Sequence, residues 1–358
     1  MVFVKFYAYN SKYVYSEWSS TGSMHEGLYD HRITILHDGQ VLVTGGMIKE
    51  NECSQNIELY DPSKGTWKTT GRMKRPRCYH SATLLPNGKV LIAGGMLGAN
   101  KDFLNSSELY DPTKGTWEIT DSMHIARSDH TATLLKNGDV LIAGGTDGHW
   151  YTNSAELYNV ATGKWTTTGT MNNARCFHST TILSDGQVLV TGGGFFSSSD
   201  NSTEVYNPAT QIWTIVGHLN HGRYDHTITL LPDGKVLVTG GMGPGAHIMN
   251  TVELYDPSTR KWTAKNSMKT QRNAHTATLL EDEKVLVVGG YSDHTPYIAE
   301  SAELYDIKTG TWTTTDKMAL PRGLHAATLL RNGKVLVTGG VDGALVGLTS
   351  SELYDPKA

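Results

Sequence analysis

An arginine and a histidine recur together along this chain of 358 residues. In six places the arginine stands three residues before the histidine, at intervals of about 50 residues. The pairs are Arg77 and His80, Arg127 and His130, Arg175 and His178, Arg223 and His226, Arg272 and His275, and Arg322 and His325. A seventh copy has Leu28 and His31. Guanidinium groups bind anions, and imidazoles bind metal ions or carry protons, so one interpretation is an anion or metal site.

A second interpretation is structural, and we favour it. Each copy also contains a glutamate that the guanidinium group would face in the third predicted strand. These glutamates are Glu58, Glu108, Glu156, Glu204, Glu253, Glu303 and Glu352. A residue present in every copy is normally needed by the fold, whereas one ligand breaks the symmetry of a repeat. We therefore expect a structural ring of His31, His80, His130, His178, His226, His275 and His325.

The copies differ just before the histidine. That residue is acidic in copies one, three and five and aromatic in copies two and four, namely Asp30, Asp129, Asp225, Tyr79 and Phe177. The preceding position adds Tyr29 and Tyr224. Because the three aspartates lie on alternate copies, and neighbouring side chains of a strand point to opposite faces, we expect no metal site.

The elements that position these residues repeat with a glycine pair. Gly45-Gly46 is the first of seven pairs, and successive pairs are separated by 48 to 50 residues. Each copy contains four short β-rich runs that alternate with turn signals such as Asn87-Gly88, a dipeptide typical of tight hairpins. A repeat of this length without a long helical segment indicates blades arranged around a central channel.

The repeat resembles the kelch β-propeller family, including the repeats of galactose-oxidase type. The resemblance rests on the glycine pair after the second run, a tyrosine before the next turn and a tryptophan about seven residues later, as in Tyr110 and Trp117. It covers residues 18–356 and implies an all-β, seven-bladed propeller of four-stranded antiparallel blades. The first strand of each blade would lie innermost and the tryptophan strand outermost.

We expect one domain over residues 1–358. The last copy has no tryptophan strand, so residues 14–24, which contain Trp18, are predicted to complete the last blade and close the ring. The segment 1–13 has no assigned place. The predicted blades span roughly residues 25–73, 74–123, 124–171, 172–219, 220–268, 269–318, and 319–356 together with 14–24.

The linkers with the Arg-His pairs and the loops between second and third strands should open at the same end of the ring, which we call the rim. The loops carry aromatic side chains, including Trp150 and Tyr151 in copy three, Phe196 in copy four and Tyr297 in copy six. Exposed aromatic residues on a rigid scaffold are typical of binding faces. The candidate ligand-binding residues are Tyr29, Asp30, Arg77, Tyr79, Asp129, Trp150, Tyr151, Phe177, Phe196, Tyr224 and Asp225.

Composition excludes several classes of function. The net charge is −4 and no block of basic residues occurs, so we expect no nucleic-acid partner. No apolar run is long enough to span a membrane, and the first residues lack the features of a signal peptide, so we expect a cytoplasmic protein. Three scattered cysteines suggest no disulfide framework and a reducing compartment. We expect a monomer without cofactors.

Two hypotheses for function remain open. The first is a non-enzymatic module that binds a protein, peptide or glycan on the rim. The second is an enzyme of isomerase, lyase or oxidase type that acts on a carbohydrate or small metabolite at the channel mouth, with an acid–base pair from an aspartate and a ring histidine. Some kelch enzymes use rim arginines and acidic residues, but the copper ligands of galactose oxidase have no match here. Catalytic residues stay unassigned.

Overall fold

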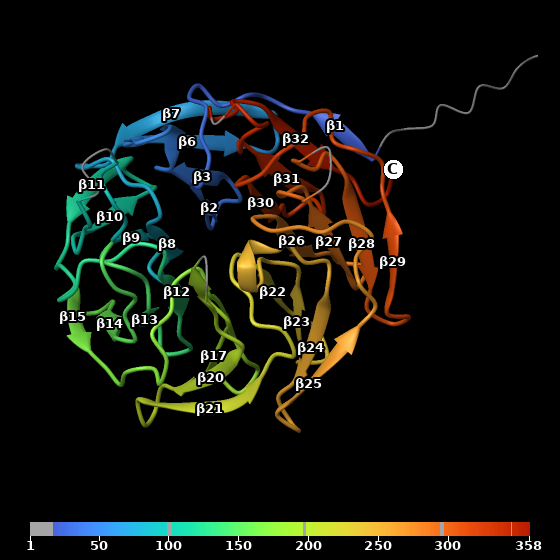
Figure 1. Cartoon of the computed structure of the whole chain (residues 1–358). Coiled ribbons are helices and arrows are strands. Elements are labelled where there is room, and N and C mark those ends of the chain that lie inside the picture. The colour runs from blue at the N-terminus through green and yellow to red at the C-terminus, as the bar shows by residue number, and fades with distance from the viewer. Residues whose placement is uncertain (1–16, 99–101, 196–197, 294–296, 345) are drawn as a thin grey trace, which may run out of the picture.

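A computed structural model describes residues 17–98, 102–195, 198–293, 297–344 and 346–358. Seven four-stranded antiparallel sheets form a ring around a central channel (Figure 1). Each sheet is one blade, and the first strands of neighbouring blades contact one another around the channel. The all-β, seven-bladed propeller predicted from the repeat is confirmed.

The strands of each blade follow one another from the channel outward. Blades 1 to 3 contain β2 (Arg32–Ile35), β3 (Val41–Thr44), β6 (Asn56–Asp61), β7 (Thr66–Arg72); β8 (Ser81–Leu84), β9 (Val90–Ala93), β10 (Ser107–Asp111), β11 (Thr116–Ile119); and β12 (Thr131–Leu134), β13 (Val140–Ala143), β14 (Ala155–Asn159), β15 (Lys164–Thr167). Blades 4 and 5 contain β16 (Ser179–Ile182), β17 (Val188–Thr191), β20 (Ser202–Asn207), β21 (Ile212–His218); and β22 (Thr227–Leu230), β23 (Val236–Thr239), β24 (Val252–Asp256), β25 (Lys261–Lys265). Blades 6 and 7 contain β26 (Thr276–Leu279), β27 (Lys284–Val288), β28 (Ala302–Asp306), β29 (Thr311–Thr314); and β30 (Ala326–Leu329), β31 (Val335–Thr338), β32 (Ser351–Tyr354), β1 (Trp18–Ser20).

Short elements occupy some of the loops between second and third strands. They are the two-stranded sheets β4 (Met47–Lys49) with β5 (Glu52–Cys53) and β18 (Gly194–Phe195) with β19 (Ser198–Ser199), and the 3-10 turn η1 (Pro244–Ala246). Residues after the glycine pair also bridge back to the linker before the first strand, as Met47 does to Tyr29. Linkers and loops therefore share one end of the ring, which is the rim.

The hydrophobic core lies in the seams between blades. Second strands such as β3 are fully buried, which explains their continuous apolar sequence, because both faces of the sheet pack against a neighbouring blade. Leu36 and Leu42 of blade 1, for example, pack with Val90 and Ile92 of blade 2. On the outer half of each blade the repeated tyrosine and tryptophan face each other across β-strand pairs, with ring centroids 5.0 to 5.2 Å apart.

The two ends of the described chain close the ring. Strand β1 pairs antiparallel with β32, and Trp18 lies opposite Tyr354 as each tryptophan does in the other blades. The predicted closure by the N-terminal strand is therefore confirmed. Residues 1–13 and the first part of the predicted strand, residues 14–16, lie outside the described residues.

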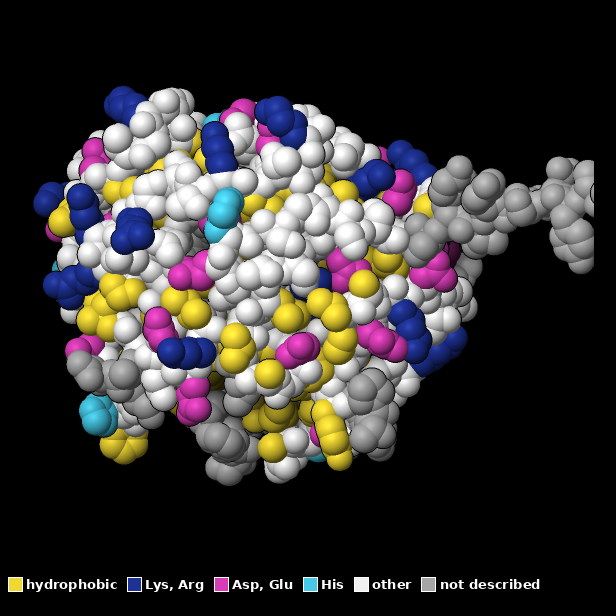
Figure 2. Space-filling model, turned by 90° about the horizontal axis from the view of Figure 1, so that it is seen from above, with side chains coloured by type: hydrophobic (Ala, Val, Ile, Leu, Met, Phe, Trp, Pro, Cys, Tyr) yellow, Lys and Arg dark blue, Asp and Glu magenta, His cyan; other side chains and the backbone are white. Residues whose placement is uncertain are grey.

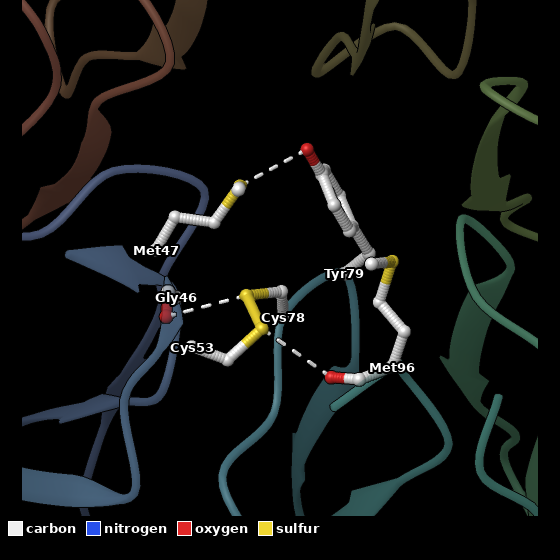
Figure 3. Close-up of a disulfide and its surroundings, with 6 residues drawn as sticks. All are labelled: Gly46, Met47, Cys53, Cys78, Tyr79 and Met96. Atoms are coloured by element: carbon white, nitrogen blue, oxygen red, sulfur yellow. Dashed lines mark hydrogen bonds between the residues drawn. A yellow bond between two sulfur atoms is a disulfide. The ribbon is translucent and has the colours of Figure 1, made fainter. Parts of the chain in front are cut away.

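A disulfide joins Cys53 of β5 to Cys78 in the linker before β8 (Figure 3). The two residues are separated by 25 positions and come from blades 1 and 2, with Cα atoms 5.4 Å apart. Cys176 is a buried free thiol. The cysteine pattern predicted no disulfide framework and did not anticipate this single bond, so cysteine usage no longer supports a reducing compartment.

Surface charge is mixed. On the side of the ring shown in Figure 2, Lys and Arg side chains are interspersed with Asp and Glu rather than gathered in one basic patch. In the part of the chain that the structure describes, no helix has the length and apolar character needed to cross a membrane.

Candidate functional site

The repeated arginines are buried in the blades. Arg77 donates through Nη1 to the carbonyl oxygens of Gly94 and Ser106, both at 2.9 Å, and through Nη2 to Glu108 Oε1 at 2.9 Å. All six repeat this pattern with their own glutamate and are 0 or 1% exposed. Arg77 is thus held inside blade 2 and does not reach the rim surface. The prediction that Arg77 binds a ligand on the rim therefore does not fit its buried position.

Blade 1 has no arginine at this position, and other groups form hydrogen bonds with its buried glutamate. Glu58 is 1% exposed and accepts a hydrogen bond from His25 Nδ1 at 2.7 Å and from the backbone amides of His25 and Glu26. The Glu26 carboxylate in turn accepts from Asn56 Nδ2 at 3.1 Å and from Ser54. The contact with His25 is not peculiar to blade 1, because in blade 3 Glu156 is bonded to His124 Nδ1 as well as to Arg127.

The seven repeated histidines are also buried, at 0 to 7% exposure. In six of them Nε2 forms a hydrogen bond with a serine or threonine hydroxyl of the preceding blade, as His80 does with Thr44 Oγ1 at 3.0 Å. Burial lowers the pKa of every one, that of His31 to about 3, so the rings are neutral at pH 7. The imidazoles link blades instead of facing a ligand at the mouth.

His31 is the exception among these rings. Unlike the other six rings, His31 forms no hydrogen bond with a serine or threonine hydroxyl among the described residues. Its ring faces blade 7, where Ala326 stands at the position of Ser81 and Thr131. Thr338, at the position of Thr44, instead accepts a hydrogen bond from Ser351 Oγ at 3.0 Å.

The glycine pairs make room for these side chains. A Cβ atom on Gly94 would lie 2.6 Å from the Arg127 carbonyl oxygen and 2.7 Å from His130 Cε1. Both glycines of the pair also have positive φ, +64° for Gly94 and +93° for Gly95. Glycine is therefore required here by contact as well as by backbone conformation.

Seven residues circle the channel at the rim, and we call them the mouth ring. They are the residues just before the histidines: Asp30, Tyr79, Asp129, Phe177, Asp225, Ala274 and Leu324. All seven have left-handed backbone conformations, with φ between 49° and 55°. Six backbone hydrogen bonds of 2.9 to 3.4 Å run from the amide of one member to the carbonyl of the preceding member, for example from Asp225 to Phe177. The side chains of the mouth ring are half-buried.

The three aspartates of the mouth ring influence one another electrostatically. Burial raises the pKa of Asp30 to about 6, that of Asp129 to about 7 and that of Asp225 to about 8. The charge of Asp30 adds to the rise at the other two, and Asp129 adds to the rise at Asp225. The guanidinium group of Arg32 opposes the shift at Asp30 and Asp129. The mouth therefore gains negative charge as the pH rises through the neutral range.

Hydrogen bonds hold part of the mouth ring. Ser128 Oγ donates to Asp129 Oδ2 at 2.6 Å. The Tyr79 hydroxyl lies 3.2 Å from Met47 Sδ, beside the disulfide (Figure 3). Burial raises the pKa of Tyr79, so the phenol is neutral.

The other candidate aromatic residues divide into buried and exposed sets. Tyr29 and Tyr224 are 5% and 3% exposed and pack beneath the rim, where the Tyr224 hydroxyl lies 2.7 Å from Met242 Sδ. Trp150 is 79% exposed and Tyr297 66%, whereas Tyr151 is half-buried. Phe196 lies outside the described residues. Val346 of blade 7, 54% exposed, is an apolar rim residue that the sequence pattern gave no reason to select.

Within the described ranges, no three His, Cys, Asp or Glu side chains lie close enough together to hold a metal ion.

Among solved structures, the chain resembles a fungal alcohol oxidase of the AA5 family in complex with copper, with a TM-score of 0.78 and 17% identity. The match covers 95% of this chain and 76% of that one. At this identity the likeness shows the fold alone. The fold is widespread, since 1052 solved chains match, so resemblance of this kind does not select a function.

No curated protein matches the chain. The KLHDC2/KLHL20/DRC7 Kelch-repeats domain model matches residues 3–193 and again 178–356, which together span nearly the whole sequence. With its glycine pairs, paired Tyr and Trp rings and seven blades, the chain belongs to this Kelch-repeat family.

Proposed function

We propose that this propeller is a recognition scaffold that binds a protein segment on the rim and receives a basic side chain in the mouth ring. The observation that carries the proposal is the set of three carboxylates that act on one another across the mouth ring. Membership in a Kelch-repeat family supports a protein-binding scaffold.

The rim supplies two kinds of contact. Trp150, Tyr297 and Val346 are large side chains that expose more than half of their surface, and aromatic residues are enriched at protein interfaces. The carboxylates of Asp30, Asp129 and Asp225 supply charge complementary to lysine or arginine. Arg32 neutralises part of that charge at Asp30 and Asp129 but is not among the groups that shift Asp225.

The enzymatic alternative gains no specific support from this geometry. It needs an aspartate and a ring histidine that converge on a substrate, but all seven imidazoles are buried. The likeness to an alcohol oxidase concerns the fold only. Glycan binding on the same aromatic residues is the competing form of recognition, and the experiment below distinguishes it.

A peptide library selected against the purified propeller tests the proposal. We expect enriched sequences to contain a lysine or arginine, and we expect Trp150→Ala to weaken a selected peptide at least about tenfold in a fluorescence polarisation assay. The matched control is Ile119→Ala, which removes a residue that is 71% exposed on the outer strand β11 and should leave affinity unchanged. Enrichment without basic residues, or binding of glycans and not peptides, would contradict the proposal.

A further inference from the structure

The disulfide joins two positions of the rim that another seam leaves unjoined. Cys53 lies in the loop of blade 1, opposite the residue after the glycine pair, and Cys78 lies in the linker that enters blade 2. In the seam between blades 3 and 4 the same two positions hold Tyr151 and Cys176. Cys176 is a buried free thiol whose Sγ donates to the carbonyl oxygen of Gly194 at 3.6 Å. The repeat therefore accommodates a thiol at the position of Cys78 without a covalent bond to the preceding blade.

Hydrogen-bond acceptors lie beside both sulfur atoms of the disulfide. Cys53 Sγ is 3.4 Å from the carbonyl oxygen of Met96, and Cys78 Sγ is 3.5 Å from that of Gly46 (Figure 3). These two carbonyl groups already accept hydrogen bonds from the backbone amides of Cys78 and Ser54, at 3.0 and 2.8 Å. A disulfide has no hydrogen to donate, whereas two thiols would each find an acceptor in place. The surroundings are therefore satisfied in the disulfide form and in the dithiol form.

The β4–β5 hairpin that carries Cys53 connects the rim loops of three blades. Lys49 forms a backbone bridge to Val346 of blade 7, and Glu52 forms one to Gly98 of blade 2. These bridges consist of backbone hydrogen bonds between rim loops, which open more easily than the ladders of the blades. The disulfide is thus the covalent anchor of a hairpin that spans the rim from blade 7 to blade 2.

The same hairpin contacts the mouth ring. Tyr79 follows Cys78 directly, and its hydroxyl lies 3.2 Å from Met47 Sδ in β4 (Figure 3). Met47, Cys53 and Cys78 belong to one apolar cluster, against which Tyr79 and Leu324 of the mouth ring pack. A movement of the hairpin would therefore change the packing of two members of the mouth ring.

We propose that Cys53 and Cys78 form a reversible redox clamp on the rim. In the disulfide form the clamp fixes the β4–β5 hairpin against the linker of blade 2 and holds Tyr79 in the mouth ring. In the dithiol form the hairpin and the loops that it bridges move more freely, while the seven blades stay folded. The seam of Cys176 supports the second statement, because its loop is held without a disulfide.

The clamp opens by exchange with a dithiol. Cys53 is 8% exposed and follows the exposed tip of the hairpin, residues 49–52, whereas Cys78 is 0% exposed. Local opening of the hairpin therefore presents Cys53 Sγ first. A thiolate of the dithiol attacks this sulfur, the bond between the two cysteines breaks, and the Cys78 thiolate leaves and takes up a proton. The second thiolate of the reductant then displaces Cys53, which also takes up a proton, so the dithiol becomes a cyclic disulfide and two electrons pass to the protein.

Thiol labelling and hydrogen exchange on the full chain test the clamp. The Cys176→Ser variant is used, because its remaining cysteines are Cys53 and Cys78 and because blade 3 has a serine at this position. We expect iodoacetamide to label neither cysteine in the native protein and both after treatment with dithiothreitol in the absence of denaturant. We expect residues 47–53 to exchange at least about tenfold faster in the dithiol form, with β9 and β31 unchanged. Labelling that requires denaturant, or equal exchange in both forms, would overturn the proposal.

A double variant, Cys53→Ser with Cys78→Ser, mimics the open clamp without a reductant. It should show the fast exchange of residues 47–53 and still unfold in one cooperative transition, at a lower temperature than the disulfide form because its unfolded chain is less constrained. The matched control is Cys176→Ser alone, which keeps the disulfide and the slow exchange. A double variant that does not fold would overturn the proposal, since the blades would then need the disulfide. Neither readout depends on a rim ligand, so the clamp and the proposed function can fail separately.

Discussion

The buried framework of the blades and the mouth ring at the rim are built from adjoining residues of the same repeat, yet they differ in kind. In the framework, arginine, glutamate, histidine and the glycine pair recur in nearly every copy and are buried and hydrogen-bonded. In the mouth ring, the backbone recurs in all seven copies but the side chains do not. The backbone of the mouth ring is therefore part of the scaffold, while its side chains vary from blade to blade.

The largest loss of folding stability is expected where a buried charge loses its partner. Arg272→Met leaves Glu303, which is 0% exposed, without the guanidinium group that lies 3.1 Å from its Oε1. We expect the free energy of unfolding to fall by about 3–5 kcal/mol in denaturant titration. Adding Glu303→Gln should recover part of the loss, because no unpaired charge then remains. A loss below about 1 kcal/mol for the single variant would mean that the pair is not part of the framework.

The next largest loss of stability is expected from a substitution in the glycine pair, where a side chain would meet close contacts. Gly94→Ala forces a Cβ atom against the Arg127 carbonyl oxygen in a left-handed conformation, so we expect a loss of about 2 kcal/mol or more. Gly245→Ala is the matched control. Its φ is +71°, but nothing lies within 4 Å of the added atom, so only the backbone cost of about 1 kcal/mol applies. Equal losses in the two variants would show that packing against the next blade does not require the glycine.

A substitution in the mouth ring is expected to have a smaller effect and to increase the stability of the fold. The pKa of Asp225 is raised from 3.8 to about 8, so the folded state holds this proton more tightly than the unfolded state does. The free energy of unfolding should therefore fall as the pH rises from about 4 through about 8. Asp225→Asn removes this dependence and should be the more stable protein at about pH 8, by about 1 kcal/mol after allowing for solvent screening.

The comparison between about pH 5 and about pH 8 is the control for that prediction. The advantage of Asp225→Asn should shrink at the lower pH, because the folded wild-type protein then keeps its proton. An advantage that is the same at both values would mean that the carboxylate does not titrate in the neutral range.

The two regions also differ in what their sequence reveals. The spacing of pairs such as Gly94 and Gly95 was enough to predict the blades, the ring and its closure by Trp18. The left-handed mouth ring could not be predicted, because Tyr79, Asp129 and Leu324 share no residue type that signals positive φ. The disulfide was missed for a related reason, since Cys53 and Cys78 belong to different blades and only the closed ring brings them together.

The site residues were predicted unevenly. Differences between copies pointed to Asp30, Asp129 and Asp225, and the structure places all three in one ring. Arg77 was predicted to bind a ligand although equivalent arginines recur in other copies. It is buried against Glu108 and does not reach the rim surface.

The affinity of a library-selected basic peptide, measured between about pH 6 and about pH 8, tests the central claim most directly. Deprotonation of the mouth ring should make binding tighter as the pH rises, and the double variant Asp129→Asn with Asp225→Asn should lose most of this dependence. The contradicting result is a double variant that binds the peptide as tightly as the wild-type protein and with the same pH dependence.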